Sequence, residues 1–319
     1  MSLMMKAMTY NYPEEIPVAV WATPAIWMEQ GNEMVRLARE YPEFFAAADI
    51  PDLNRLSDYM PPSYRLGETV DEWGCVWSNV HEGMEALVTG HPVPNREDIM
   101  SLQIPDRDSG NVPHGFMYMR LLDLRGFMEV MIDFAEECEE LQVLIDKVLT
   151  YNCRQIAVKL KKSADADYLV FGDDLGMQRG MAIGADKWRK YLKPCYQKMY
   201  RIVHEAGKKV YMHSDGDIVE IIPDLAECGV DMINPQFRAN GLQNLVRVCK
   251  GKIPVHLDLD RQLFPFATPA ELDEHVRECV EAFYLPAGGF AIYIELTCGI
   301  PLDNAAALLE AARKYRHWR

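Results

Sequence analysis

Short runs of β-branched and aromatic residues alternate with longer segments of helical period in the second half of the chain. This alternation is typical of βαβ units, in which a strand is followed by a helix and then by a parallel strand. We predict strands at 168–172, 209–213, 230–234, 253–258 and 290–296. Helices are predicted after Asp186 and at 218–228, 242–249, 269–284 and 303–315.

The helix predicted after Asp186 shows the clearest pattern, because its apolar residues recur at steps of three and four and therefore share one face. They are Trp188, Tyr191, Leu192, Cys195, Met199 and Ile202. Pro194 lies within this helix, and its missing N–H and bulky ring should kink or split it. Gly229 and Gly251 are predicted to end the helices that precede them.

The first half of the chain has a weaker pattern. Strands are predicted at 18–22 and 116–120, and helices at 33–45, 126–134 and 139–162. The segment 63–92 is rich in Trp, Gly and His, which favours an inserted hairpin or lid over a regular unit. A further strand is predicted inside it, at 75–79.

These elements favour one α/β domain over residues 1–319, a single (β/α)8 TIM-type barrel with an N-terminal extension and the inserted hairpin or lid. Seven strands are clear, and 75–79 would be the eighth. An open, doubly wound sheet is the alternative. The chain has neither the G-x-G-x-x-G fingerprint nor the Walker pattern, so nothing favours a nucleotide-binding version of that alternative.

Charge and composition exclude several kinds of partner. The formal net charge of −15 disfavours nucleic acid and anionic membranes, since both attract positive surfaces. No apolar run is long enough for a signal peptide or a membrane span, so we expect a cytoplasmic protein. The eight cysteines show no C-x-x-C spacing, which favours reduced thiols. A homodimer is left open by the sequence.

Polar residues follow the predicted late strands, where the active sites of β/α barrels lie. They are Asp173, Asp174 and Gln178; His213 and Asp215; Asn234 and Gln236; Asp258 and Asp260; and Glu295 and Cys298. Imidazole, carboxylate and thiol groups from different strands can surround one zinc ion and leave a position open for substrate. The same groups can also form a metal-free acid/base pocket.

The segments that carry these residues resemble the uroporphyrinogen decarboxylase superfamily, chiefly over positions 165–310. They are Gly-Asp-Asp-Leu-Gly-x-Gln at 172–178, His-Ser-Asp-Gly at 213–216, Gly-Val-Asp-x-x-Asn-Pro at 229–235 and Cys-Gly-Ile-Pro-Leu-x-Asn at 298–304. The superfamily has a cofactor-free decarboxylase branch and a branch of zinc methyltransferases that serve corrinoid proteins. The region 21–32 lacks the arginines of the decarboxylase branch, so the chain is more similar to the methyltransferases.

The methyltransferase branch implies a zinc ion bound by a His-x-Cys motif and a late cysteine. His213 matches the histidine and Cys298 the late cysteine, whereas Asp215 stands where the first cysteine would be. Asp215, Asp258 or Glu295 could complete the ligand set. The resemblance therefore implies transfer of a methyl group between a small methylated O-, N- or S-compound and a corrinoid protein.

From the motifs and the resemblance together we assign three roles. The predicted catalytic residues are Asp174, His213 and Asp215. The predicted metal ligands are His213, Cys298, Asp258 and Asp215. The predicted substrate-binding residues are Gln178, Asn234, Gln236 and Glu295. Two other functions are left open, a metal-free decarboxylase or lyase that uses Asp174 and His213, and a non-catalytic module that binds a corrinoid or a tetrapyrrole.

Most of these residues also have a purely structural interpretation. Asp173 and Asp174 could cap the next helix or accept backbone N–H groups in their loop. The amides of Gln178, Asn234 and Gln236 could satisfy loop backbone. His213 could bond to a backbone carbonyl, and Cys298 could be an ordinary buried thiol. Asp258 and Asp260 could pair with Arg261 or Arg238.

Charged residues away from these strand ends are expected to be structural. Arg120, Asp123 and Arg125 lie inside an apolar run, which favours a buried ion-pair network over an anchor for an anionic substrate. His204, His275 and His317 lie on predicted helices and are expected to be exposed.

Overall fold

Parallel strands flanked by helices make up most of the chain, which a computed structural model describes over residues 1–318. The described residues form two units. The first comprises Met1–Thr69, Ser78–Leu87 and residues 241–318, and the second comprises Val70–Trp77 and Val88–Asn240. Each unit contains three parallel strands, so the α/β class predicted from the sequence is confirmed.

The second unit contains the strands β5 (Tyr168–Gly172), β6 (Lys209–Ser214) and β7 (Met232–Pro235). β6 lies between the other two and pairs with both in parallel. The pairing aligns Gly172 with His213, and His213 with Asn234. All residues of β7 and most of β6 are buried, as expected for parallel strands covered on both faces.

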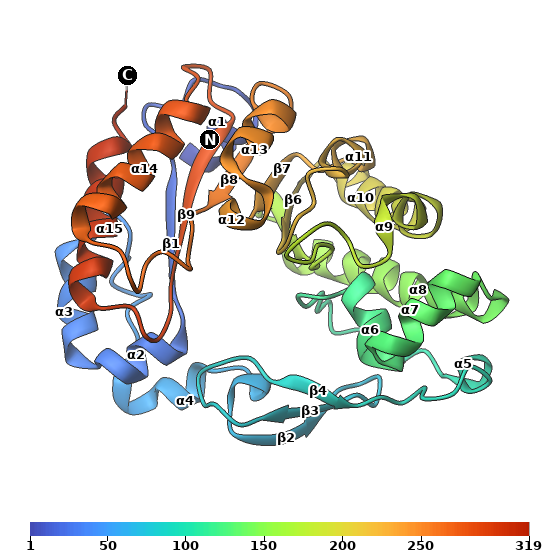
Figure 1. Cartoon of the computed structure of the whole chain (residues 1–319). Helices are drawn as coiled ribbons and strands as arrows, with labels where there is room; N and C mark the ends of the chain where they lie inside the picture. Colours follow the sequence, from blue (N-terminus) through green and yellow to red (C-terminus); the bar gives the residue numbers. More distant parts are fainter. Residues whose placement is uncertain (319) are drawn as a thin grey trace. The chain divides into compact units, whose positions relative to one another are not determined.

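Helices accompany these three strands: α8 packs against α10, and α10 packs against β6 (Figure 1). The helices of the second unit are α5 (Asp98–Ser101), α6 (Tyr118–Arg125), α7 (Phe127–Glu136), α8 (Glu139–Lys162), α9 (Gly184–Lys187), α10 (Lys193–Glu205), α11 (Ile222–Cys228) and α12 (Phe237–Asn240). The predicted helix at 139–162 is confirmed at both ends.

The helix predicted after Asp186 is split, as the position of Pro194 led us to expect. A π-helical turn, Trp188–Leu192, separates α9 from α10, and Pro194 lies in the first turn of α10. Proline is tolerated in the first turn of a helix, because the N–H that it lacks would have no partner within the helix there. Gly229, with φ of 104°, ends α11 as predicted.

The first unit contains β1 (Val18–Ala22), β8 (Val255–Asp258) and β9 (Phe290–Leu296). β9 pairs in parallel with both others and aligns Glu295 with Trp21. Its helices are α1 (Leu3–Met8), α2 (Pro24–Gln30), α3 (Asn32–Glu40), α4 (Leu56–Tyr59), α13 (Leu242–Cys249), α14 (Pro269–Phe283) and α15 (Leu302–Tyr315), with 3-10 turns at Leu53–Arg55 and Pro62–Tyr64.

A small sheet occupies the segment where we predicted an inserted hairpin or lid. It consists of β2 (Gly67–Val70), β3 (Val76–Asn79) and β4 (Leu87–Gly90), in that order. The strand predicted at 75–79 therefore exists, but it belongs to this sheet. Its prediction as the eighth strand of a barrel was wrong, because it pairs with its neighbours in sequence rather than with the parallel strands.

The strand predicted at 116–120 was also wrong, because the segment begins helix α6. The carboxylate of Asp173 accepts hydrogen bonds from the backbone N–H groups of Met117, Tyr118 and Met119. These donors at the start of a helix have no partner within the helix, so a buried carboxylate there stabilises helical over extended backbone. The described chain thus has six parallel strands, and closure of eight into a barrel stays a prediction.

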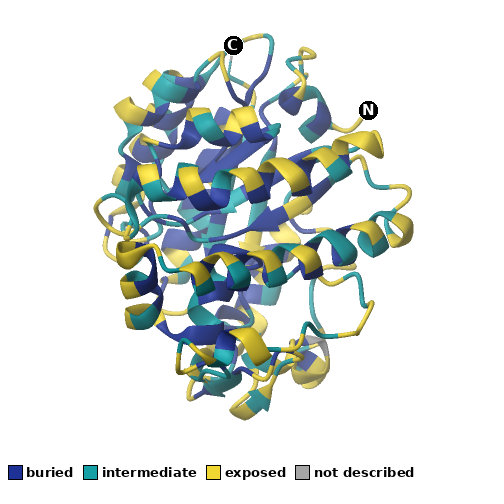
Figure 2. Ribbon diagram, turned by 90° about the vertical axis from the view of Figure 1, so that its right-hand side faces the viewer, coloured by how far each residue is buried: buried dark blue, intermediate teal, exposed yellow. Residues whose placement is uncertain are grey.

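The apolar stripes of the helices face inward, and Figure 2 shows helices that are dark blue along one side and yellow along the other. On the described part of the chain, no helix combines the length and apolar character needed to cross a bilayer.

Candidate active site

Two neighbouring strands of the second unit deliver three of the predicted catalytic groups to one place. His213 lies at the end of β6, and Asp174 follows β5. The Nε2 atom of His213 is 3.1 Å from Oδ1 of Asp215 and 3.9 Å from Oδ1 of Asp174. The backbone N–H of Asp215 donates to that same Asp174 oxygen at 2.9 Å. The predicted convergence of Asp174, His213 and Asp215 is therefore present, while their chemical roles stay predictions.

A second imidazole, which the sequence analysis missed, completes this cluster. His114 precedes α6, and its Nε2 atom lies 3.2 Å from Oδ2 of Asp174. The ring centroids of His114 and His213 are 5.6 Å apart. His114 follows no strand, so the strand-end rule could not find it. The flanking Pro113 and Gly115 indicated a turn, but a turn alone does not predict a site.

Each acid–base partner in the cluster favours the charged form of the other. Burial acts to lower the pKa of His114, but the hydrogen bond and negative charge of Asp174 outweigh it and raise that pKa above the usual range. Burial acts to raise the pKa of Asp174, but His114 and His213 outweigh it and leave that pKa lowered. The contact between His114 and Asp174 therefore favours an ionised carboxylate beside a protonated imidazole.

Asn234 and Gln236, predicted to bind substrate, both make contacts within the second unit. Oδ1 of Asn234 lies 2.7 Å from Nδ1 of His213. Because an amide oxygen only accepts, Nδ1 must carry the proton, and in neutral His213 the Nε2 lone pair then faces the carboxylates. Oε1 of Gln236 accepts the N–H of Gly216 at 2.9 Å. Both amides thus have the supporting contacts that the structural interpretation expected, and Gln178 is exposed.

The loops after β5 and β6 pass so closely that only glycine fits at their crossing. A Cβ atom on Gly176 would lie 2.5 Å from the backbone of Gly216 and Asp217. The N–H of Gly176 donates to the Asp215 carbonyl at 3.2 Å, and the N–H of Asp217 donates to the Met177 carbonyl at 2.8 Å. The glycines of both motifs therefore fix the loops that carry Asp174 and Asp215.

The cluster has the dimensions of a metal site. His114, Asp174 and His213 each offer a ligand atom, and these atoms lie within 4.8 Å of one another. Zinc bonds of about 2.0–2.1 Å in a tetrahedron place neighbouring ligand atoms roughly 3.3 Å apart. Within this group, the separation of 3.2 Å between His114 and Asp174 and that of 3.9 Å between His213 and Asp174 lie around that value. This group could hold a metal ion through nitrogen and oxygen donors.

The remaining predicted ligands belong to the first unit. Asp258 is 1% exposed and pairs with Arg261, whose Nη2 atom lies 3.1 Å from Oδ2 of Asp258. Nη1 of Arg261 lies 2.9 Å from Oε1 of Glu295. The pairing of Asp258 with Arg261 confirms the structural interpretation of that contact. Cys298 is exposed rather than buried. A metal centre shared by His213 and Cys298 stays a prediction.

One histidine was placed wrongly by the sequence. His275 was expected to be exposed, but it is 6% exposed, and its Nε2 atom accepts the backbone N–H of Asp260 at 3.1 Å. The helix α14 presents this side chain toward the loop after β8 instead of toward water. Helical period alone predicts poorly whether such a histidine is exposed or buried, because one contact with a loop decides where its side chain points.

The charged residues of α6 form buried networks, as predicted. Arg120 donates to Asp71 at 2.5 Å and lies 3.7 Å from Asp123. Arg125 pairs with Asp133, whose side chain is fully buried. These contacts fasten α6 to α7 and to the segment before β3, so they support the second unit rather than a substrate anion.

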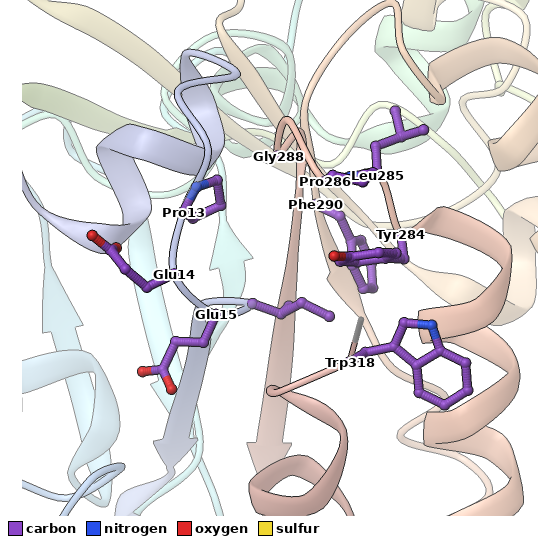
Figure 3. A pocket seen from close by; sticks show the side chains of 10 residues that line it. Pro13, Glu14, Glu15, Tyr284, Leu285, Pro286, Gly288, Phe290 and Trp318 are labelled. Carbon is purple, nitrogen blue, oxygen red and sulfur yellow. The ribbon is translucent and has the colours of Figure 1, made fainter.

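A separate pocket lies in the first unit, near the start of β9 (Figure 3). Its volume is about 350 Å³. Pro13, Tyr284, Phe290 and Trp318 are among its lining residues, with Glu14 and Glu15 at its edge. Since Glu295 and Cys298 lie at or beyond the other end of β9, this pocket is not part of the predicted site.

The parallel strands define an α/β protein, and imidazole and carboxylate groups gather where β5 and β6 end. A sequence model described as uroporphyrinogen decarboxylase (URO-D) matches residues 115–315. The chain therefore belongs to the uroporphyrinogen decarboxylase family, as its motifs indicated. No curated protein sequence matches the chain significantly.

Among solved structures, a methyltransferase from Methanosarcina mazei is similar over 98% of this chain and 98% of its own, with 18% identity and a TM-score of 0.69. At that identity the similarity shows the fold alone. A dihydropteroate synthase from Xanthomonas albilineans matches at 18% identity over 52% of this chain and 60% of its own, with a TM-score of 0.35. A chitinase from Chromobacterium violaceum matches at 10% identity over 95% and 100%, with a TM-score of 0.40. These two scores are too low to carry an argument.

Proposed function

We propose that this protein is a metal-dependent methyltransferase that moves a methyl group between a small methylated O-, N- or S-compound and a corrinoid protein. The observation that carries the proposal is the cluster of His114, Asp174 and His213 at the ends of β5 and β6. The likeness in fold to a methyltransferase and the methyltransferase-like motifs around His213 and Cys298 support it.

The proposed metal is zinc, held by the Nε2 atoms of His114 and His213 and by the carboxylates of Asp174 and Asp215. When bound, it supplies Lewis acidity to the heteroatom that exchanges its methyl group. A nitrogen and oxygen donor set leaves more of that acidity to the substrate than thiolates do, which suits the demethylating direction. Asn234 fixes the tautomer of His213, as supporting residues of metal sites commonly do.

The other predicted site residues keep their roles in this proposal, except that Asp258 is less suited to its role. Cys298, which the resemblance implied as a ligand, is exposed and stays a prediction beside the four donors named above. Asp258 is less suited to bind a metal, because Arg261 already neutralises its carboxylate. Glu295 and Gln178 stay predicted substrate contacts. Asp215 takes the place of the family cysteine as an oxygen donor.

Metal analysis is the direct test. Protein purified without chelators should contain about one zinc ion per chain, and His114→Ala, Asp174→Asn and His213→Ala should each lose it. The pair of His204 and Asp231 offers a matched control, because its imidazole and carboxylate lie 2.8 Å apart in the same unit but outside the cluster. His204→Ala should keep the metal. Metal retained by all three cluster variants contradicts the proposed ligands.

Turnover needs a second experiment with the partner protein. The holoenzyme is mixed with a corrinoid protein reduced to cobalt(I) and with a panel of methylated ethers, amines and thioethers. Methylation of the corrinoid should appear as loss of the cobalt(I) absorbance with one class of donor, and Asp174→Asn should abolish it. Unchanged absorbance across the panel, with complex formation verified, argues against methyl transfer.

A metal-free lyase of the same family is the second candidate, and one observation favours it. The distances of 3.1 and 3.2 Å in the cluster are also hydrogen-bond lengths, so a proton on each imidazole could hold the carboxylates in place. Asp174 would then stabilise positive charge, and His213 would donate a proton. Zinc-free protein that decarboxylates a polycarboxylate substrate at an undiminished rate after chelation supports this candidate over the transferase.

A further inference from the structure

The ring of His114 lies directly over the end of β5, where only glycine leaves room for it. A Cβ atom built on Gly172 would lie 2.4 Å from Nδ1 of His114. Gly172 is not among the residues with positive φ, so its backbone does not itself require glycine. Glycine is therefore required at position 172, the first residue of the Gly-Asp-Asp motif, because any side chain there would collide with the ring of His114.

The second residue of the motif fastens the loop that carries His114. The Asp173 carboxylate is fully buried and accepts the N–H groups of Met117, Tyr118 and Met119 at 3.2, 2.6 and 2.9 Å. It also accepts the hydroxyl of Tyr196 at 2.6 Å. Burial raises the pKa of Asp173, and these donors partly offset that rise. Three of these hydrogen bonds join the start of α6 to the residue that follows β5, and the fourth joins that same carboxylate to α10.

Two further bonds hold the loop on both sides of His114. The N–H of Gly115 donates to the carbonyl of Gly172 at 2.8 Å. The side-chain amide of Asn152, on α8, donates to the carbonyl of Phe116 at 2.7 Å. The backbone next to His114 is thus fixed to a strand and to a helix, although the residue itself lies in no regular element.

We infer that Gly172 and Asp173 are positioning residues, which place Nε2 of His114 next to Oδ2 of Asp174. Each of the three consecutive residues of the motif has a different role in placing His114. Gly172 leaves the space for the ring, Asp173 fastens the loop, and Asp174 contacts the imidazole. The inference rests on the site in the proposed function, but it holds whether a metal ion or a proton lies between His114 and Asp174.

The variant Gly172→Ala tests the space, and Tyr196→Phe tests the fastening. Tyr200→Phe is the matched control, because Tyr200 is equally buried on the same helix and its hydroxyl contacts Met212 instead of Asp173. The first readout needs no metal. It is the rate at which diethylpyrocarbonate modifies His114 in chelator-treated protein, measured by peptide mass spectrometry with His204 as the internal reference.

We expect Gly172→Ala to raise the modification rate of His114 several-fold, because the displaced ring no longer has Nε2 covered by Asp174. Tyr196→Phe should raise it less, and Tyr200→Phe should leave it unchanged. A second readout is the zinc dissociation constant from competition with a chromophoric chelator. Loss of supporting residues commonly weakens metal sites by about 10–100-fold, and we expect Gly172→Ala to fall in that range.

The outcomes separate this inference from the proposed function. An unchanged His114 rate in folded Gly172→Ala protein overturns the inference, whatever the metal content. A raised rate in a protein that never binds zinc supports the inference and contradicts the metal-dependent function. Thermal unfolding of each variant guards against a general loss of structure, since that would also raise the rate at His204.

Discussion

A partly buried carboxylate on α6, that of Asp123, makes the stability of the protein depend on pH in a way that one substitution can isolate. Burial raises the pKa of Asp123 from 3.8 to about 7; the charge of Arg120 opposes this rise, and that of Asp71 adds to it. One guanidinium thus faces two carboxylates. In Asp123→Asn the ionisable group is removed while its size is kept.

The sign follows from proton binding in the two states. Between pH 3.8 and about 7 the unfolded chain has Asp123 ionised, whereas the folded protein keeps it protonated. The contribution of Asp123 to the free energy of unfolding is fully present below pH 3.8, and it is lost as the pH rises from 3.8 to about 7. At about 1.4 kcal/mol per pH unit, the loss between about pH 5 and about pH 7 amounts to roughly 2 kcal/mol.

Urea unfolding followed by circular dichroism measures this loss. The free energy of unfolding is compared between the variant and the wild type, at each of two pH values. The free energy of unfolding of Asp123→Asn minus that of the wild type should be roughly 2 kcal/mol more positive at about pH 7 than at about pH 5. Other titrating groups cancel in this comparison. Asp106→Asn, at a fully exposed carboxylate, is the control and should show no such trend. A difference that is equal at both pH values would mean that Asp123 is ionised throughout, and the reasoning would fail.

Three further substitutions probe the supports of the site and of the fold. Gly176→Ala should lower the melting temperature and reduce zinc binding, because its Cβ meets the rigid backbone of Gly216. Asp133→Asn should lower the free energy of unfolding by about 3–5 kcal/mol, since it removes the buried carboxylate that pairs with the buried Arg125 and leaves only the exposed Glu129. Thr268→Ala should cost about 1 kcal/mol in urea unfolding, because it removes the capping box of α14.

Each of these has a control that changes less. Gly172→Ala should unfold at a higher temperature than Gly176→Ala, because the added methyl group meets a rotatable imidazole rather than backbone. Glu129→Gln touches the same Arg125 from an exposed position and should cost less than about 1 kcal/mol. Equal melting temperatures of the two glycine variants would show that contact with rigid backbone does not set the loss of stability. Equal unfolding free energies of Asp133→Asn and Glu129→Gln would show the same for burial of the ion pair. A Thr268→Ser variant that is as unstable as the alanine variant would contradict the capping explanation.

The strands of the second half could be predicted from the sequence because their pattern is local. Tyr168–Gly172 and Phe290–Leu296 were predicted to the residue, since each is a short β-rich run bounded by turn residues. The strand-end rule then brought Asp174, His213 and Asp215 together correctly, because the ends of parallel strands share an edge. The family motifs, which are also local, agree with the family match over residues 115–315.

Tertiary contacts decided what local pattern could not. The apolar residues of segment 116–120 fit either a strand or a helix, so the local pattern cannot choose between them. The carboxylate of Asp173, far along the chain, favours the helix because it accepts the N–H groups at the start of α6. The same contact carries His114 to Asp174 from a loop that has no periodic signal. A hydrogen bond between residues more than fifty positions apart leaves no trace in the spacing of either segment, so only the folded chain reveals the second imidazole.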